Sequence, residues 1–529
     1  MFPNTFIVAQ FLIAVLLCGC VVFKRPLTAT CNSLLSKILN IYLSYRYPVK
    51  HVEFGHRIPG CDYEFPNGQG DGAKFLHGKE NSELWESKYG SIYQIWSGHK
   101  PEIVLTQAVD IQAVFSDSDK HFKAVNNNSG YLLGQILGQC VGLISGQQWK
   151  RVRSIVEKPF HRSITPRYVP MIEQRTTSFF QELWDTRDLS RELIDPADDL
   201  KLLPFLIVAE VVYGKLAPDV ESELRALAPI RESFFKHVIS GGLTRFDWSA
   251  YLPTQANKDL AAFRERWVVF NEFACRRAKE QGINAPILDL FAAKETGELT
   301  ENEMLHTLDE MLYANLDVTI GGVSWNLVFL ASDISVQDEL RAEYQAAQKE
   351  ADENGLTLEK YLSSSTTLLA ACVSEASRLR PLAAFSVPQS IPTRRVVGGY
   401  EFPAGTNFVI DSYALNIRNQ FWGEDKATYR PKRFMERTST QSRYNFWRFG
   451  FGPRQCMGKF VADTLIRNIL VHLVRGYDLS LLKTEEWQRN ADIWINHPDM
   501  KLSGFQMSVS QCNIQMFDPV QTEDDLCWS

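Results

Sequence analysis

Cysteine pairs at the short spacings typical of disulfide frameworks are missing from this chain of 529 residues. The ten scattered cysteines indicate a reducing compartment. The ten histidines include no i, i+4 pair on a helical stretch, so the sequence predicts no zinc site. The cysteines are Cys18, Cys20, Cys31, Cys61, Cys140, Cys275, Cys372, Cys456, Cys512 and Cys527.

Excess basic charge is also missing. The chain has 56 Lys and Arg against 62 Asp and Glu, a formal net charge of −6, so nucleic acid is not expected as a partner. No repeat, low-complexity segment or long Gly/Ser linker interrupts residues 60–510. We expect one catalytic domain there, followed by a C-terminal tail at 511–529.

One long apolar run stands at the N-terminus, from Phe6 to Phe23, and Lys24-Arg25 follows it at once. The run is long enough to cross a bilayer. A cleavable secretory signal is the alternative, but no basic segment precedes the run and no small-x-small cleavage site follows it. We expect residues 1–25 to hold a single-pass anchor, with a transmembrane helix at about 6–23 and the rest of the chain in the cytosol.

Residues 26–59 are expected to link the anchor to the domain. Their stretch 34–43 is amphipathic, so it either lies along the membrane surface or forms an ordinary linker helix. The domain pattern is mainly helical, with short strands predicted at 92–96 and 407–410. The predicted fold class is therefore mainly α with small β-sheets.

The most informative segment spans residues 449–458 and reads FGFGPRQCMG, with a lone cysteine between glycines. Backbone N–H groups beside such a cysteine are able to hydrogen-bond its sulfur and tune a bound iron. Residues 457–466 read as a helix, so Cys456 lies near a helix N-terminus, where the dipole favours a negative sulfur. The alternative is an inert buried cysteine in a glycine-rich turn.

Five positions, Phe449, Gly452, Arg454, Cys456 and Gly458, match the haem-binding signature of the cytochrome P-450 superfamily, which this chain resembles. The resemblance implies that Cys456 is the axial thiolate ligand of the iron in haem b. It also implies that Phe449 shields the sulfur from water and that Arg454 meets a haem propionate.

A long helix is predicted from a capping box at Thr300 and Glu303 to about residue 330. Inside it, residues 314–319 read ANLDVT and resemble the oxygen-binding segment of the cytochrome P-450 distal helix. The resemblance implies that Ala314 gives room over the iron and that Asp317 is the acid of a proton relay.

The same segment departs from the family pattern, because Asn315 stands where glycine is usual and Val318 where the relay threonine is expected. Three interpretations are open: Thr319 takes the role through a local bulge, the substrate supplies the hydroxyl, or the reaction depends less on a relay. The structural alternative is that Asp317 and Thr319 only satisfy backbone groups. Asp317 and Thr319 are the catalytic candidates.

Two further motifs resemble those of the superfamily. Glu375 and Arg378, on one face of a helix at 368–380, and Arg433 in a proline-ordered loop resemble its Glu-Arg-Arg triad, whose implied role is to lock the cysteine loop. Trp149 and Arg153 resemble its Trp-x-x-x-Arg helix, which implies that both bind one propionate.

One propionate partner is missing from the pattern. Gln389 stands near the place where an arginine is common in the superfamily, and Arg394 is the candidate substitute.

The resemblance covers roughly residues 60–510 and implies a membrane-anchored monooxygenase of the endoplasmic reticulum. Such enzymes take electrons from NADPH through a membrane-bound cytochrome P-450 reductase, split O₂ and oxidise a C–H bond. Basic residues beside the proximal motifs are either a docking face for the reductase or a solvated surface. They are Lys150, Arg151, Lys158, Arg443, Arg448 and Lys459.

Apolar candidate linings at 131–133, 234–235 and 385–387 indicate a hydrophobic small-molecule substrate. Residues 314–319 and 445–450 look similar to those of fungal enzymes that tailor polyketide, polyketide–peptide or cyclic-dipeptide products, so a secondary-metabolite intermediate is expected. Other classes stay open. One is a haem-thiolate enzyme catalysing ring expansion, desaturation or isomerisation, which Val318 favours, and another is a non-catalytic haem sensor or carrier.

Overall fold

The structure, a computed structural model, describes residues 26–186, 193–354, 358–482 and 487–506. The expected transmembrane segment at 6–23 and the tail at 511–529 lie outside these ranges. Helices dominate the described chain, with bounds α2 Pro26–Arg46, α3 Gly78–Tyr89, α4 Ala108–Phe115, α5 Tyr131–Leu137, α6 Gly146–Val156, α7 Val169–Thr186, α8 Leu202–Tyr213, α9 Pro218–Ser240, α10 Gln255–Glu280, α11 Pro286–Glu295, α12 Glu301–Ala314, α13 Ile320–Ser332, α14 Ile334–Asn354, α15 Glu359–Ser363, α16 Leu368–Leu379, α17 Ser439–Ser442 and α18 Lys459–Gly476.

The strands form small sheets. One five-stranded sheet has the order β2-β3-β9-β6-β4, in which β3 and β9 run parallel and the other pairs antiparallel. Two three-stranded sheets have the orders β1-β8-β7 and β10-β11-β5. The strands are β1 Lys50–His51, β2 Ile92–Ser97, β3 Lys100–Leu105, β4 Phe122–Lys123, β5 Leu193–Ile194, β6 Gln389–Ser390, β7 Arg395–Val397, β8 Tyr400–Phe402, β9 Asn407–Ile410, β10 Tyr477–Leu481 and β11 Leu502–Gln506. The predicted fold class is confirmed, and β2 and β9 are the two predicted strands.

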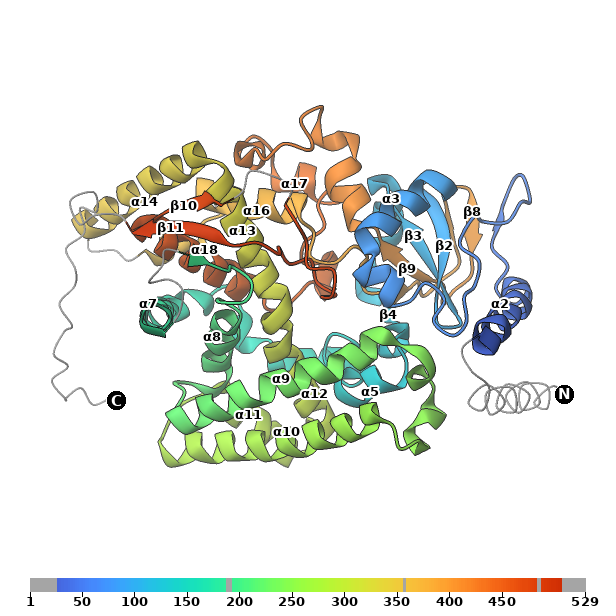
Figure 1. Ribbon diagram of the computed structural model, residues 1–529, viewed down its shortest axis with the longest axis horizontal. Helices are drawn as coiled ribbons and strands as arrows, with labels where there is room; N and C mark the ends of the chain where they lie inside the picture. The colour runs from blue at the N-terminus through green and yellow to red at the C-terminus, as the bar shows by residue number, and fades with distance from the viewer. Residues whose placement is uncertain (1–25, 187–192, 355–357, 483–486, 507–529) are drawn as a thin grey trace.

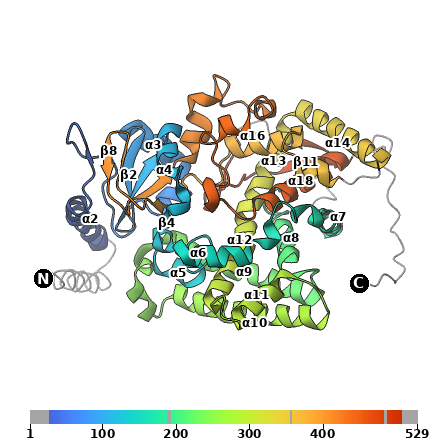
Figure 2. The same ribbon diagram turned by 180° about the vertical axis from the view of Figure 1, so that it is seen from behind.

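The five-stranded sheet and the helices occupy different ends of the molecule. Figure 1 shows β2, β3 and β9 with α3 at one end, beside α2, and most of the helices at the other; Figure 2 shows β2, α3 and α2 at the same end from behind. In both views α12 and α13 pass through the middle of the helical part, with α9, α10 and α11 on one side of them. The long predicted helix is thus the spine of the domain.

The start and the length of this spine agree with the prediction from the sequence. The capping box is present: Glu303 N–H donates to Thr300 Oγ1 (3.2 Å), and Thr300 N–H donates to Glu303 Oε2 (2.9 Å). The helix then runs as α12, a π-helical turn at Asn315–Thr319, and α13. These three segments form one continuous helical path that ends at Ser332.

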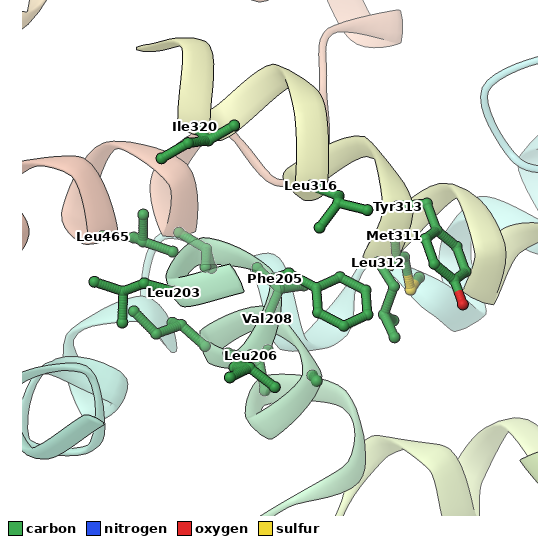
Figure 3. Packing of buried hydrophobic residues seen from close by; sticks show 14 of the residues in the cluster. Leu203, Phe205, Leu206, Val208, Met311, Leu312, Tyr313, Leu316, Ile320 and Leu465 are labelled. Carbon is green, nitrogen blue, oxygen red and sulfur yellow. The ribbon is translucent and has the colours of Figure 1, made fainter. Parts of the chain in front are cut away.

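The spine packs against α8 through apolar side chains. Figure 3 shows Phe205 of α8 below Leu316 and beside Leu312 of the spine, with Leu206 lower down and Leu465 of α18 beside Leu203. These side chains are almost fully buried. Each such burial contributes about 1.5–3 kcal/mol relative to an exposed side chain. The packing fixes which face of the spine is free to border a site.

An ion pair ties the spine to the next layer. Arg231 of α9 donates to both carboxylate oxygens of Asp309 in α12, at 2.8–3.2 Å, and both side chains are buried. Phe235 and Tyr313 lie beside the guanidinium. The pair holds α9 at a set position over the spine.

Apolar side chains along α2 face outward. Leu34, Ile38, Tyr42 and Tyr45 are all exposed, and Ile41 is exposed by 74%. Within the described ranges no single helix combines the length and apolarity needed to cross a membrane. The pair Glu301–Ser332 and Ile334–Asn354 meets both criteria together, with a bend of 109° between its halves.

Candidate functional site

The loop before α18 carries Cys456 in a closed backbone turn. Cys456 N–H donates to the Phe449 carbonyl (2.9 Å), and Gln455 N–H donates to the Gly452 carbonyl (3.1 Å). Gly452 has φ +67°, and a Cβ at this position would lie 2.3 Å from Ser118 Oγ. Only glycine fits both the backbone and the space. The helix that follows begins at Lys459, two residues later than predicted.

The Cys456 side chain faces a space inside the protein. It is exposed, yet burial is the largest influence on its thiol, so the space that it faces is enclosed by the chain. Burial raises the pKa of the Cys456 thiol, and a hydrogen bond from Gly458 N–H and the charges of Arg153 and Lys459 oppose the rise. Nearness to a helix N-terminus does not by itself keep the sulfur negative here. A bound metal cation would supply the missing positive charge.

The end of α12 borders the same space. Ala314 is exposed, although Leu312 and Tyr313 before it are buried. Glu310 lies one turn earlier, near enough for its charge to raise the pKa values of both Cys456 and Arg454. The end of α12 and the cysteine loop therefore lie on two sides of one interior space, as expected for a cofactor held between them.

The turn after Ala314 is π-helical. Thr319 Oγ1 donates to Asn315 Oδ1 (2.7 Å), and the Asn315 amide donates to the Met311 carbonyl (2.5 Å). A π-turn inserts an extra residue into the helix and so rotates Thr319 toward the Ala314 face. The structure contains the local bulge that one interpretation of the missing threonine requires. It joins Thr319 to Asn315, however, and not to Asp317.

Asp317 is held from the C-terminal segment, which no sequence pattern indicated. Trp494 Nε1 donates to Asp317 Oδ2 (3.1 Å), and His497 Nε2 lies 2.6 Å from the Asp317 carbonyl oxygen. Burial lowers the pKa of His497, so the neutral ring donates this bond at neutral pH. Partners 177 and 180 residues away leave no local signal in the sequence.

Arg454 and Trp149 are brought together. The Arg454 guanidinium lies 4.8 Å from the centroid of a Trp149 ring, and its Nη atoms donate to the carbonyls of Ile144 (2.6 Å) and His121 (3.4 Å). Its Nε has no hydrogen-bond partner among the described residues. Burial lowers the pKa of Arg454 to about 10, with the Arg153 charge as the next cause. This guanidinium has lost water without gaining a carboxylate.

Arg153 is engaged elsewhere. Its Nε lies 2.5 Å from Glu157 Oε2, and its Nη1 donates to the Gln455 carbonyl (3.3 Å), next to Cys456. Arg394 forms an exposed pair with Glu401. Arg153 thus contacts the cysteine loop, while Arg394 has its partner on the surface.

Lys123 is a cation near Arg454 that the sequence analysis did not single out. In the β4–β6 ladder it lies opposite Gln389, and directly opposed residues project to the same side of a sheet. Burial, together with the Arg454 charge, lowers the pKa of Lys123 to about 7. No described carboxylate lies within ion-pair distance of it. A cation thus stands one strand away from the position where an arginine is common.

Other polar atoms beside Lys123 also lack partners. Gln389 Oε1 and His121 Nδ1 are buried without a hydrogen bond among the described residues, and His121 Nε2 lies 3.5 Å from Asp117 Oδ1. Buried groups of this kind are normally satisfied. Of these groups, the cations Lys123 and Arg454 fit an anionic ligand, whereas the Gln389 oxygen is an acceptor and requires a donor. A thiol facing an interior space beside such a cluster fits haem, which has an iron, a flat apolar ring and two carboxylates.

The predicted triad is assembled and fully buried. Arg378 donates to both Glu375 oxygens (2.8 and 2.9 Å), and Arg433 Nε donates to Glu375 Oε1 (3.0 Å). All three side chains are 0% exposed. Arg433 Nη1 also donates to the Trp422 carbonyl (2.8 Å). One carboxylate therefore joins α16 to the loop around residue 433.

A second set of contacts connects the triad to the cysteine loop. Arg378 Nη1 donates to the Asn416 carbonyl (2.9 Å). The Asn416 side chain bonds both backbone groups of Trp447, at 2.7 and 2.8 Å. Trp447 lies edge to face with Phe451, at 5.1 Å between ring centroids. The triad thus positions the start of the turn that ends at Cys456.

Comparisons with known proteins agree with this arrangement. Residues 76–501 match the sequence profile of the family Cytochrome P-450. The chain is 50% identical over 466 residues to the cytochrome P-450 monooxygenase aclC of Aspergillus oryzae, covering 87% of this chain and 94% of the relative. It is 46% identical over 497 residues to the cytochrome P-450 monooxygenase asaD of Aspergillus flavus, covering 94% and 96%.

A solved structure resembles the same fold. A zebra fish cytochrome P-450, solved with progesterone, superposes with a TM-score of 0.65 at 18% identity, covering 81% of this chain and 99% of the other. At this identity the likeness concerns the fold alone.

Replacing Glu375 tests the triad. Glu375→Gln removes the charge shared by two buried arginines, and breaking a buried pair of this kind costs about 3–5 kcal/mol. We expect a large fall in the urea midpoint of unfolding. Glu436→Gln, which removes an exposed partner of Arg430, is the control and should change the midpoint little. Equal midpoints for the two variants would contradict the role given to the triad.

Replacing Gly452 tests the closed turn. Gly452→Ala places a side chain in the left-handed region and against Ser118, with a cost of at least about 1–2 kcal/mol. Thermal unfolding should begin several degrees lower. Gly476→Ala, where nothing lies within 4 Å of the new methyl group, should unfold like the wild type. A normal melting temperature for Gly452→Ala would show that the turn tolerates a side chain.

Proposed function

The chain belongs to the cytochrome P-450 family, and on that premise we propose that it is a membrane-anchored monooxygenase that oxidises a hydrophobic small molecule of secondary metabolism. The observation that carries the proposal is Cys456, held by its loop toward an interior space that Ala314 borders. As members of this family are haem-dependent oxidoreductases, the thiolate-ligated haem supplies the chemistry: it activates O₂ for insertion into a C–H bond.

Cys456 is the proposed axial ligand of haem b. Gly458 N–H donates to its sulfur and would lower the electron density there once the thiolate forms. The Cys456 N–H bond to the Phe449 carbonyl and the closed turn at Gly452 hold the sulfur in place before any ligand arrives. Phe449 is half-buried beside it and limits water. These contacts support a loop that is already ordered for iron binding.

The propionates are proposed to meet Arg454, Trp149 and Lys123. Arg454 and Lys123 are desolvated cations without a described carboxylate partner. Arg153 supports the same region from the cysteine-loop side, through the Gln455 carbonyl. Two anionic groups at this place would satisfy both cations. Lys123 would replace the arginine that is missing at Gln389.

Asp317 and Thr319 remain the proposed catalytic pair on the distal side, with Asn315 hydrogen-bonded to Thr319. Thr319 Oγ1 holds its proton against Asn315 Oδ1, and the Asp317 carboxylate is oriented by the Trp494 indole. The π-turn supports the interpretation in which Thr319 replaces the threonine absent at Val318. Since Val318 carries no hydroxyl, ring expansion, desaturation or isomerisation is the second candidate, and it would proceed without incorporating labelled oxygen from O₂.

Electrons are proposed to come from NADPH through a cytochrome P-450 reductase. Lys150, Arg151, Lys158 and Arg443 are exposed beside the proximal motifs. Arg151, Arg448 and Lys459 are engaged with Glu303, Asp463 and Gln455, so they contribute less to such a docking face. The exposed cations complement an acidic partner.

The proposed location is the endoplasmic reticulum membrane, with a single-pass anchor and the domain in the cytosol. The apolar run at 6–23 supports the anchor. The exposed apolar side chains of α2, among them Ile41 and Tyr45, suit contact with the same membrane surface.

The central proposal is tested by the carbon monoxide difference spectrum of the reduced protein. We expect the strongly red-shifted Soret band of thiolate ligation in the wild type and its loss in Cys456→His. Cys372→Ser, at a buried cysteine remote from the loop, is the control and should keep the band. A wild-type Soret band without this red shift would overturn the assignment of Cys456.

The propionate assignment is tested by haem release. Lys123→Gln should transfer haem to excess apomyoglobin about tenfold faster than the wild type, because a charge-assisted hydrogen bond contributes about 1.5–3 kcal/mol. Lys120→Gln, three residues earlier and exposed, should release haem at the wild-type rate. Equal rates in both variants would remove Lys123 from the set of propionate partners.

A further inference from the structure

The chain before β11 folds back on itself as a hairpin. Asn490 N–H donates to the His497 carbonyl, and Asp499 N–H donates to the Gln488 carbonyl, both at 3.0 Å. Residues 495–497, on the returning side of this C-terminal hairpin, are exposed by only 2–5%. They include an asparagine and a histidine, and polar side chains in such a place need partners.

Asn496 fixes the C-terminal hairpin between the spine and the segment after α16. Trp325 Nε1, in α13, donates to the Asn496 carbonyl (2.8 Å), and Asn496 N–H donates to the Leu382 carbonyl (2.9 Å). The Asn496 side-chain amide donates to the Pro381 carbonyl (3.1 Å) and to the Tyr413 hydroxyl (3.0 Å). The residue that follows Asn496 is therefore held at a fixed place against α13.

Two side chains of the hairpin hold Asp317 at its backbone and at its carboxylate. His497 Nε2 lies 2.6 Å from the Asp317 carbonyl oxygen, and the imidazole donates because a carbonyl only accepts. Trp494 Nε1 donates to Asp317 Oδ2 (3.1 Å). Both donors are neutral at neutral pH, since burial lowers the pKa of His497. They orient Asp317 without an ion pair, which would oppose protonation of a carboxylate.

The spine is shaped to receive the His497 ring. A Cβ at Gly321 would lie 2.8 Å from His497 Cδ2, 3.1 Å from Leu382 Cδ2 and 3.2 Å from the Asn496 carbonyl oxygen. A Cβ at Gly322 would meet nothing closer than 3.4 Å, which is an ordinary contact distance. The hairpin therefore needs a glycine at the first position and tolerates a side chain at the second.

The carbonyl that His497 binds belongs to the π-turn at Asn315–Thr319. Such turns are rare, and an unusual backbone persists where its surroundings over-determine it. Ile320 N–H, at the end of the turn, donates to the same Asp317 carbonyl. Loss of the His497 donor would act on the backbone that places both Asp317 and Thr319.

We propose that His497 is a positioning residue for oxygen activation: it fixes the π-turn and, with Trp494, the direction of the Asp317 carboxylate. The inference rests on the proposed function and adds the C-terminal hairpin to the parts that this function needs. In a productive turnover O₂, NADPH and a proton add one oxygen to the substrate and yield water and NADP⁺. With misplaced proton donors, O₂, NADPH and a proton yield H₂O₂ and NADP⁺ instead.

The structural part of the proposal is tested by amide hydrogen exchange in the full-length holoenzyme. His497→Gln keeps a side-chain N–H donor, whereas His497→Met has the same length as that variant and no donor. We expect the amides of residues 315–320 to exchange about tenfold faster in His497→Met, because one buried hydrogen bond is lost. His497→Gln should exchange like the wild type. Equal exchange in the wild type and His497→Met would overturn the inference.

The chemical part is tested with thioanisole, a small neutral probe, in the presence of NADPH and cytochrome P-450 reductase. The coupled share is the fraction of oxidised NADPH that does not appear as H₂O₂. We expect His497→Met to lower this share about threefold or more, because small displacements of catalytic groups are costly. His497→Gln should restore the share.

Two neighbouring glycines give an independent comparison. Gly321→Ala leaves the hairpin sequence unchanged but displaces the His497 ring, so it should lower the coupled share as His497→Met does. Gly322→Ala is the matched control and should keep the wild-type share. His472→Met, which replaces a histidine of α18 that stacks on Phe180 at 4.8 Å, controls for the loss of a histidine and should keep it as well.

The outcomes are separable. Absence of the red-shifted carbon monoxide band from the wild type would refute the proposed function itself. With the band intact, a wild type that releases one H₂O₂ for each NADPH would refute the relay at Asp317 on which the inference rests. A wild-type coupled share in His497→Met, or a share in His497→Gln as low as in His497→Met, would overturn the inference. Should His497→Met lose the band, the two glycine variants decide the same question.

Discussion

The buried carboxylate of Glu375 is the constraint on which the proximal half of the molecule depends. Two guanidiniums share it, and neither Arg378 nor Arg433 reaches water. A buried charge without a partner is very costly, so the position of the loop at Arg433 relative to α16 is fixed. The bonds from Arg378 through Asn416 then fix Trp447. The buried triad of Glu375, Arg378 and Arg433 thus positions the loop that carries Cys456, although none of the three residues belongs to that loop.

Features written in short stretches of sequence were predictable. The capping box at Thr300, the triad pair at Glu375 and Arg378, and the glycine turn at Gly452 all follow from residues at fixed spacing. Local chemistry dictates these structures with little help from the rest of the fold. The fold class followed in the same way, from helical periodicity with brief strand signals.

Features made by distant segments were not predictable. Trp494 reaches Asp317 across 177 residues, and Lys123 meets Gln389 only through the β4–β6 ladder. The residues next to Trp494 and Lys123 in the sequence form no motif that would indicate these contacts. The distal segment is intermediate: its departure at Val318 was visible, but the partner chosen by Thr319 depends on a π-turn that spacing does not reveal. Tertiary contacts determine the partners of Asp317, Lys123 and Thr319.

The unpaired positive charges at Lys123 and Arg454 have a consequence for how the chain matures. Two cations that have lost water without gaining a counter-ion lower the stability of the unliganded fold, and an anionic ligand that binds only the folded state recovers that stability by mass action. Under the proposed propionate contacts, cofactor supply would then influence how much of the chain is folded. Cells short of haem would hold the chain mainly in its least stable form, where proteases act first.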